Sequence, residues 1–292
     1  MTDMATAATP PAVHLRRGVR LRRRFLRRPM AIIGLVLVVL FLLLAIVGPL
    51  LTPDPLLQNL TSAIASPSAH HLLGTDDLGR DELARLASGA RVSLVAGVLS
   101  TAIAMVVGVP IGLASGYFRG WLDSVVMRLN DTVLAFPFLI FAVGFAAIFG
   151  ASLRNVVIAL AIGLLPAIVR ISRGEALVLR EQDFIGGAVA DGARPTAIMF
   201  RYLLPNSLNA LIVQATVAIP TGIVGEAALS FLGLGVQPPG ASWGLMLTSA
   251  QQFLVQAPQL AIYPGALIAL ATLGFNLLGD GLRDVLDPKD RR

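Results

Sequence analysis

The chain contains no cysteine among its 292 residues. It therefore cannot form a disulfide, and it has no thiol that could act as a nucleophile or bind a metal through sulfur. Only three histidines are present, and the adjacent pair His70 and His71 has no third histidine nearby in the sequence. No Ser/His/Asp set or zinc-binding helix motif is found. The sequence predicts neither a catalytic site nor a metal site.

Lysine is almost absent as well. The single lysine, Lys289, lies in the C-terminal segment DPKDRR. A nucleotide-binding P-loop requires the pattern G-x-x-x-x-G-K-[ST], because its lysine contacts the phosphates. The chain has no such pattern, and we expect no cofactor on it. Any use of ATP must take place on another chain.

Charged residues are scarce, at 14% of the chain, whereas a soluble domain has about 25%. Hydrophobic residues make up 55%, and the mean hydropathy is +0.77. The net charge of +6 comes from arginines that flank apolar segments. This pattern favours orientation in a lipid membrane over binding of a nucleic acid. The composition predicts an all-α membrane protein.

Six apolar segments are long enough to approach the roughly 20 residues that a membrane-spanning helix needs. The first has no charged residue and is longer than the apolar region of a signal peptide, so we expect it to be retained as a span. Several of the later segments contain glycine and proline. Ordinary packing and kinks of membrane helices are one explanation, and helices that line a wet cavity are the other. The predicted spans are 30–51, 93–117, 125–149, 155–171, 208–235 and 260–280.

The distribution of basic residues predicts the orientation of these spans. With the N-terminus inside, 19 of the 23 lysines and arginines fall in or beside cytoplasmic segments. Both termini are then cytoplasmic. The expected organisation is a basic cytoplasmic arm (1–29), a first span (30–51), an external loop (52–92), a five-helix core (93–280) and a cytoplasmic tail (281–292).

The external loop contains the charged segment GTDDLGRDELAR. Asp81 and Glu82 precede Arg85 by four and three residues, so both carboxylates can pair with it on one face of a helix. We expect a short amphipathic helix here, lying on the outer surface.

Residues 172–207 form a polar segment between two apolar ones, placed in the cytoplasm by the charge distribution. Good helix-forming residues predict a helix over 174–190. Asp191 and Gly192 predict a turn. Pro195 is suited to the first turn of a new helix, which Pro205 is expected to end. This hairpin could rest on the lipid surface or dock into a groove of a cytoplasmic protein, and residue spacing favours neither.

Glu226 is an ionisable residue in the fifth predicted span. Such residues usually face a cavity or a partner group, because charge is costly in lipid. Glu226 is therefore either a residue that lines or gates a pathway or a polar tie between helices.

The 172–207 segment resembles the signature of permease subunits of binding-protein-dependent ABC importers, in which E-A-A is followed by a glycine and by I-x-L-P. Gly186, Gly187 and Ala188 stand at E-A-A, Gly192 at the glycine, Tyr202 at the isoleucine, and Leu204-Pro205 at the end. Segments 71–94, 226–244 and 275–288 are similar to permeases of dipeptide, oligopeptide and nickel importers, most of all to the second permease of each pair, which has the shorter N-terminal arm.

The resemblance implies a type I ABC importer permease with six transmembrane helices in a bacterial inner membrane. It implies a homologous second permease, two cytoplasmic ABC ATPases that use ATP and Mg²⁺, and an external substrate-binding protein. The ATPase-coupling residues would be the following: Gly186, Gly187, Ala188, Asp191, Gly192, Ala193, Arg194, Leu204 and Pro205. The substrate would be a short peptide or another small solute such as a nickel chelate. A secondary transporter driven by an ion gradient through Glu226, and a membrane-embedded enzyme or scaffold, are the competing hypotheses.

Overall fold

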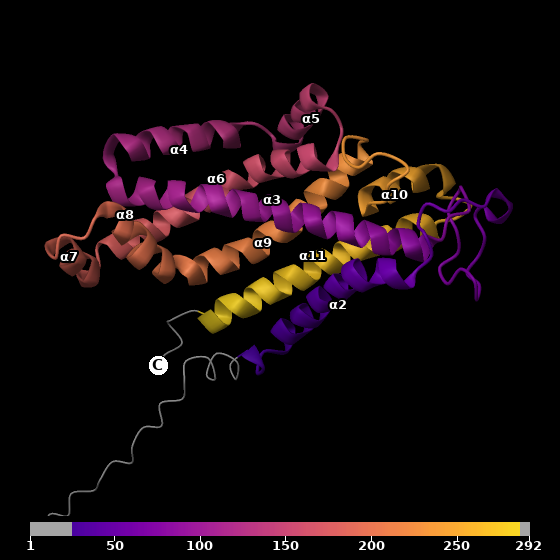
Figure 1. Cartoon of the computed structure of the whole chain (residues 1–292), viewed down its shortest axis with the longest axis horizontal. Helices are drawn as coiled ribbons and strands as arrows, with labels where there is room; N and C mark the ends of the chain where they lie inside the picture. Colours follow the sequence, from indigo (N-terminus) through magenta and orange to yellow (C-terminus); the bar gives the residue numbers. More distant parts are fainter. Residues whose placement is uncertain (1–24, 287–292) are drawn as a thin grey trace, which may run out of the picture.

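The computed structural model describes residues 25–286, and nearly all of its regular structure is helical (Figure 1). Most of the predicted basic arm (1–24) and the end of the predicted tail (287–292) lie outside the described residues. The α-helices are α2 (Pro29–Leu51), α3 (Glu82–Phe118), α4 (Gly120–Ala135), α5 (Phe138–Phe149), α6 (Leu153–Arg180), α7 (Asp183–Ala190), α8 (Pro195–Ala197), α9 (Leu204–Phe231), α10 (Trp243–Ala250) and α11 (Gln259–Leu286).

Shorter helical turns complete the described chain. A π-helix at Ile198–Leu203 joins α8 to α9, and 3₁₀ turns lie at Leu60–Ser62 and Gln251–Phe253. Within residues 25–286, five helical segments are long and apolar enough to cross a membrane, namely α2, α3, α6, the run Pro195–Phe231 and α11. Each contains one of the predicted spans or most of it.

The predicted span 125–149 is not a single helix. It is divided between α4 and α5, whose axes differ by 87°. The break falls at Phe136 and Pro137, where the backbone of Phe136 is extended (φ −86°, ψ 128°). Proline lacks the N–H that would continue the helix, and it disfavours helical geometry in the residue before it. A sixth span exists only if this bent pair is counted as one.

The helices run roughly side by side along the long axis of the molecule (Figure 1). α3, α6 and α9 form the centre, α2 and α11 pack together on one side, and α4 lies on the opposite side. The hairpin that contains α7 and α8 lies at one end, and the loop after α2 lies with α10 at the other. Arg28 at the start of α2 pairs with Asp284 near the end of α11 at 2.9 Å, so both helices place these termini at one end of the bundle.

Glycine permits the closest helix crossings. A Cβ atom built on Gly112 of α3 would lie 2.5 Å from the carbonyl oxygen of Val169 in α6, and one on Gly116 would lie 2.6 Å from that of Arg173. Such four-residue spacing of small residues lets membrane helices approach closely. The contact between α3 and α6 therefore depends on the absence of side chains.

The apolar core is divided along the axis. Near the α10 end, Trp243 packs edge-on against Phe41 of α2 with ring centroids 5.8 Å apart, and its indole N–H donates to the carbonyl oxygen of Leu86 at 3.1 Å. Near the α7 end, buried residues of α3, α6 and α9 enclose Ile185 of α7 and Ile198. The second cluster fixes the hairpin to the spans.

The 172–207 segment differs from its prediction in two places. The predicted helix 174–190 is interrupted, because α6 continues to Arg180 and α7 begins at Asp183. Pro205 does not end a helix but lies in the first turn of α9. The π-helix before it changes the backbone hydrogen-bond pattern, and at a helix start the N–H that proline lacks needs no partner within the helix.

Candidate functional site: a helical hairpin at one end of the bundle

The hairpin is anchored by one face of α7. Ile185 and Ala188, three residues apart, are buried at 2% and 6% exposure, and Ile185 belongs to the apolar cluster of α3, α6 and α9. The positions that flank this buried stripe are open, since Phe184 is 44% exposed and Val189 is 53% exposed. Phe200 after the turn is 52% exposed. The hairpin therefore presents apolar side chains outward from a fixed base.

The turn after α7 is a Schellman motif. The amide of Ala193 donates to the carbonyl oxygen of Ala188, and that of Gly192 donates to Val189, both at 3.0 Å. Gly192 has φ +79°, a conformation that favours glycine. Asp191 and Arg194 on either side are exposed. The sequence correctly identified this turn.

Gly186 and Gly187 lie on the exposed surface of α7, where a Cβ atom on either would meet nothing within 4 Å. Neither has a positive φ. Glutamate and alanine, which stand at these two positions in the E-A-A signature, would therefore fit here without a clash. Packing does not explain the two glycines. At the other end of the signature, Leu204 is half-buried and Pro205 is exposed.

Two polar contacts lie where the hairpin meets the ends of neighbouring helices. Arg119, between α3 and α4, donates to Glu181 before α7 at 2.5 Å. Arg180 donates to the carbonyl oxygen of Tyr117, and its guanidinium lies 5.7 Å from the centroid of the Tyr117 ring. The first contact joins the segment before α7 to the turn between α3 and α4, and the second joins the end of α6 to the end of α3.

Glu226 lies away from the hairpin, five residues before the end of α9 and completely buried. Its carboxylate accepts hydrogen bonds from Ser93 of α3 and Ser230 of α9, each at 2.7 Å. It therefore acts as a polar tie between α3 and α9, one of the two roles that the sequence allowed. A role in gating stays a prediction.

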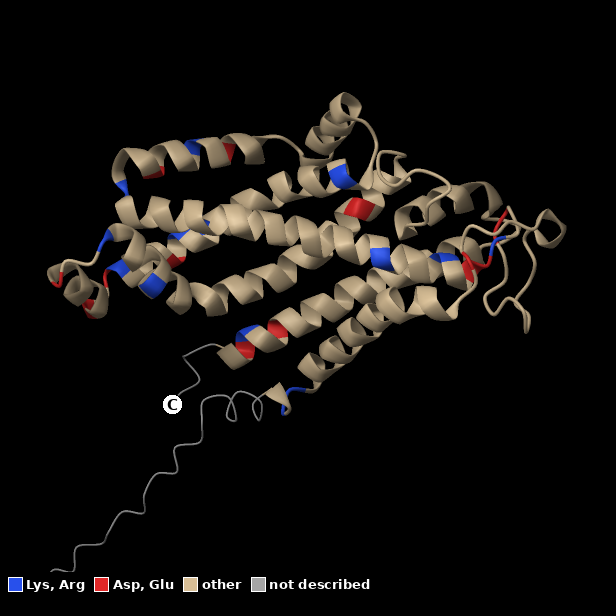
Figure 2. Ribbon diagram, viewed as in Figure 1, with Lys and Arg blue, Asp and Glu red and all other residues tan. Residues whose placement is uncertain are grey.

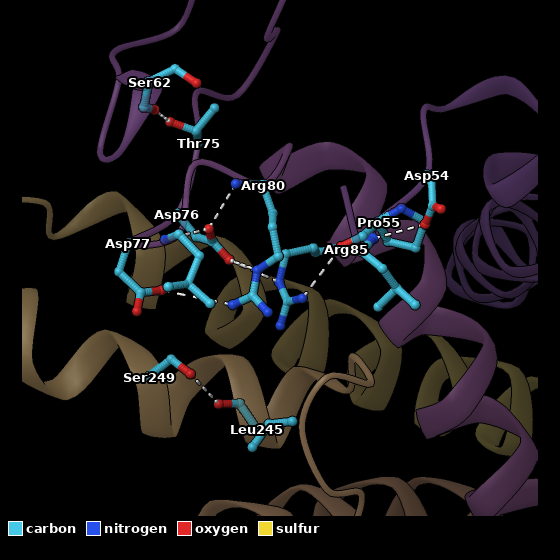
Figure 3. A network of polar contacts seen from close by, with 12 residues as sticks. Asp54, Pro55, Ser62, Thr75, Asp76, Asp77, Arg80, Arg85, Leu245 and Ser249 are labelled. Carbon is cyan, nitrogen blue, oxygen red and sulfur yellow. Dashed lines mark hydrogen bonds and ion pairs between the residues drawn. The ribbon is translucent and has the colours of Figure 1, made fainter. Parts of the chain in front are cut away.

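A buried charged network occupies the other end of the bundle (Figure 3). Asp76 accepts from Arg80 at 2.7 Å and pairs with Arg85 at 3.2 Å, and the three side chains are at most 8% exposed. Asp81 instead caps the start of α3 by accepting from the amide of Ala84 at 2.8 Å, and it contacts His71 at 2.9 Å.

The prediction of a separate amphipathic surface helix at these residues was wrong. Glu82 is the first residue of the 37-residue α3, and it is 1% exposed. The spacing of charges predicted pairs within one helix. The burial arises because the loop after α2 folds over the start of α3, a long-range contact that local spacing does not encode.

Charged residues as a whole are concentrated near the two ends of the bundle and along α4 (Figure 2). Within residues 25–286, no group of three or more His, Cys, Asp or Glu side chains is arranged to hold a metal ion.

Comparison with known proteins identifies the family. Residues 108–292 match the family described as binding-protein-dependent transport system inner membrane component, and residues 18–67 match the N-terminal TM domain of oligopeptide transport permease C. The chain is 44% identical to the dipeptide transport system permease protein DppC of Alkalihalophilus pseudofirmus, over 90% of this chain and 87% of that protein. It is 42% identical to the glutathione transport system permease protein GsiD of Pectobacterium atrosepticum, over 91% and 89%.

The fold is also found in a solved structure. An inward-facing MetNI methionine ABC transporter matches with a TM-score of 0.57 and 22% identity, over 70% of this chain and 96% of the matched chain. The all-helical fold is that of a type I ABC importer permease. The chain therefore belongs to the family of binding-protein-dependent transport system inner membrane components, and it is a multi-pass inner-membrane permease subunit of a bacterial ATP-driven importer, not an enzyme.

Proposed function

We propose that this permease forms half of a pathway for short peptides or closely related small solutes. The two relatives above are named for dipeptide and glutathione transport, which supports this substrate class. A second permease would complete the pathway, an external binding protein would deliver the solute, and two cytoplasmic ATPases with ATP and Mg²⁺ would supply the energy. Nickel chelates are a less supported alternative.

The α7 hairpin is the proposed contact with an ATPase. The observation that carries this role is that Ile185 and Ala188 are buried while the flanking Phe184 and Val189, and Phe200 after the turn, are exposed. Exposed apolar side chains on a rigid base are typical of a protein-docking surface. The ion pair between Arg119 and Glu181 ties this surface to the spans. Movement of the ATPases would then alter access along the pathway by rigid-body motion.

One substitution at two places tests the docking surface. Val189→Asp puts a charge on an exposed residue of α7. Val255→Asp puts the same charge on a residue that is 97% exposed, in the loop after α10, and α10 lies at the opposite end of the bundle (Figure 1). A buried unpaired charge weakens an interface strongly. We expect the ATPases to be lost from the purified Val189→Asp complex and retained with Val255→Asp. Retention of the ATPases by both variants would refute the assignment.

The proposed orientation places the hairpin and both termini in the cytoplasm. Because this chain has no cysteine, a single Arg194→Cys substitution introduces its only thiol. A membrane-impermeant thiol reagent should label this residue after cells are permeabilised and not before. Labelling in intact cells would contradict the orientation.

The competing ion-gradient mechanism depended on Glu226 as a residue accessible from the pathway. In this structure the carboxylate is enclosed between two serine hydroxyls and has no exposed surface. Together with the family assignment, this favours ATP as the source of energy.

A further inference from the structure

Helix α4 is attached to the bundle by polar contacts. Asn130 is its single buried residue, and the side-chain amide donates to the carbonyl oxygen of Pro166 in α6 at 3.3 Å. Arg173 of α6 donates twice to Asp123, at 2.5 and 2.6 Å. Both contacts are at least partly enclosed. They explain how a helix with almost no buried apolar face stays on α6.

A third polar contact between these helices is open. Arg170 of α6 donates to Asp131 of α4 at 2.9 Å, and the two side chains are 54% and 60% exposed. The corresponding values for Arg173 and Asp123 are 30% and 17%. No described residue of this chain covers the outer pair.

The length of α6 places the open pair within the apolar layer, toward the edge nearer the hairpin. α6 has 28 residues and is about 42 Å long, about 12 Å more than a hydrocarbon core of about 30 Å. Arg170 lies ten residues before Arg180, or about 15 Å from the end of α6. If all the excess length projected at that end, Arg170 would lie about 3 Å inside the edge of the apolar layer, and it lies deeper if the excess is shared between the two ends.

Lipid is a poor environment for these two charges. Ionisable residues within membrane helices almost always face a bundle interior or a water-filled cavity. Since Asp131 and Arg170 do not face the interior of this chain, they face water or the second permease. In a permease, a watery face at this depth belongs to the substrate pathway.

We propose that Asp131 and Arg170 form a transit subsite for a solute that carries both an ammonium and a carboxylate group, as a short peptide does. This inference rests on the proposed peptide function. The Asp131 carboxylate would accept from the ammonium, and the planar Arg170 guanidinium would donate to the carboxylate. When no solute is present the two groups satisfy each other, so the subsite holds its solute weakly, as passage through a pathway requires.

Thiol labelling tests whether this face is wet. Thr132→Cys places a thiol beside Asp131, and Leu40→Cys places one on the uncharged helix α2, at a residue that is 55% exposed. Each variant is assembled into the complete importer in membrane vesicles, treated with a charged, membrane-impermeant thiosulfonate, and analysed on this subunit. We expect labelling of Thr132→Cys to be at least about 10-fold faster, and to be slowed by a dipeptide that the wild-type importer takes up. Equal rates, or a rate that the dipeptide does not change, would overturn the proposal.

Charge variants separate a subsite from a structural tie. We expect Asp131→Asn and Arg170→Gln each to lower dipeptide uptake about 10-fold while the ATPases still co-purify. The double variant Asp131→Arg/Arg170→Asp restores an ion pair between α4 and α6 with its polarity reversed, and we expect uptake to stay low. Uptake restored to the wild-type level by the double variant would show that the pair is only a tie.

The two proposals fail in different ways. If the wild-type importer takes up no dipeptide, the proposed peptide function fails. If wild-type uptake and ATPase assembly are normal and Asp131→Asn has no effect on uptake, only the subsite fails.

Discussion

Replacing Glu226 by leucine removes the acceptor of two buried hydrogen bonds while keeping a side chain of similar size. The hydroxyls of Ser93 and Ser230, each 2.7 Å from the carboxylate, lose their partner in a site with no exposed surface. Hydrogen bonds between membrane helices contribute about 0.6 kcal/mol on average and up to about 1.7 kcal/mol. We therefore expect Glu226→Leu to lower the free energy of unfolding by about 1–3 kcal/mol.

A double-mutant cycle measures the contact itself. Glu226→Leu, Ser93→Ala and the double variant are compared by equilibrium unfolding of the purified subunit in mixed detergent micelles. Because both single variants lose the same hydrogen bond, the double variant should be more stable than the sum of the single losses predicts, by about 0.6–1.7 kcal/mol. Strictly additive losses would show that Glu226 and Ser93 do not interact, and would refute the assignment of Glu226 as a tie between α3 and α9.

The glutamine variant distinguishes a tie from a gate. An amide at this position can accept from one serine and donate to the oxygen of the other. We expect Glu226→Gln to retain assembly, stability within about 1 kcal/mol and transport. Loss of transport with normal assembly would instead indicate that the carboxylate is required for gating.

Three further substitutions test the packing, the hairpin and the buried network. Gly112→Ala brings a Cβ within 2.5 Å of a backbone oxygen on α6 and should destabilise the subunit by about 1–3 kcal/mol in the same unfolding assay. Its control is Gly174→Ala, whose Cβ would have nothing within 4 Å and which should be neutral or slightly stabilising. Gly192 has φ +79°, so Gly192→Ala should destabilise the hairpin by about 1–2 kcal/mol and make proteolysis of the hairpin faster. Gly187→Ala meets no neighbouring atom and should stabilise α7 by up to about 1 kcal/mol, which makes proteolysis of the hairpin slower. Asp76→Ala leaves two buried guanidinium groups without this carboxylate and should cost about 3–5 kcal/mol, while equal stability to wild type would show that the network is dispensable.

Much of the architecture could be predicted because the bilayer constrains the sequence strongly. Helices that cross lipid must satisfy their backbone internally, so long apolar segments identify them without reference to tertiary contacts. The turn at Gly192 was similarly local, since its positive φ requires a residue without a side chain. The helix boundaries near Pro137 and Pro205 were less predictable. Proline broke the helix at the first position and started one at the second, and the difference depends on the hydrogen bonding of the preceding turn.

The burial of the charged residues in the loop after α2 could not be predicted from local spacing. Asp81 and Arg85 have the spacing of an exposed helical pair, yet Asp81 caps α3 while Arg85 pairs with Asp76 across a loop. The same spacing is compatible with an exposed surface or a buried network, because it contains no information about which loop covers the helix.

The sequence by itself determined that this protein is a helical membrane subunit, and it predicted that the energy for transport comes from another chain. The length of the apolar segments, the basic residues that flank them and the absence of a P-loop motif are properties of the sequence that can be recognised without a folded structure. Only the tertiary structure decided what the polar residues of the spans do. It placed Glu226 between two serines and left Asp131 and Arg170 on an open face. The physical reason is that the environment of a charge depends on which helices pack beside it, and that packing is set by long-range contacts such as the glycine crossings of α3 and α6.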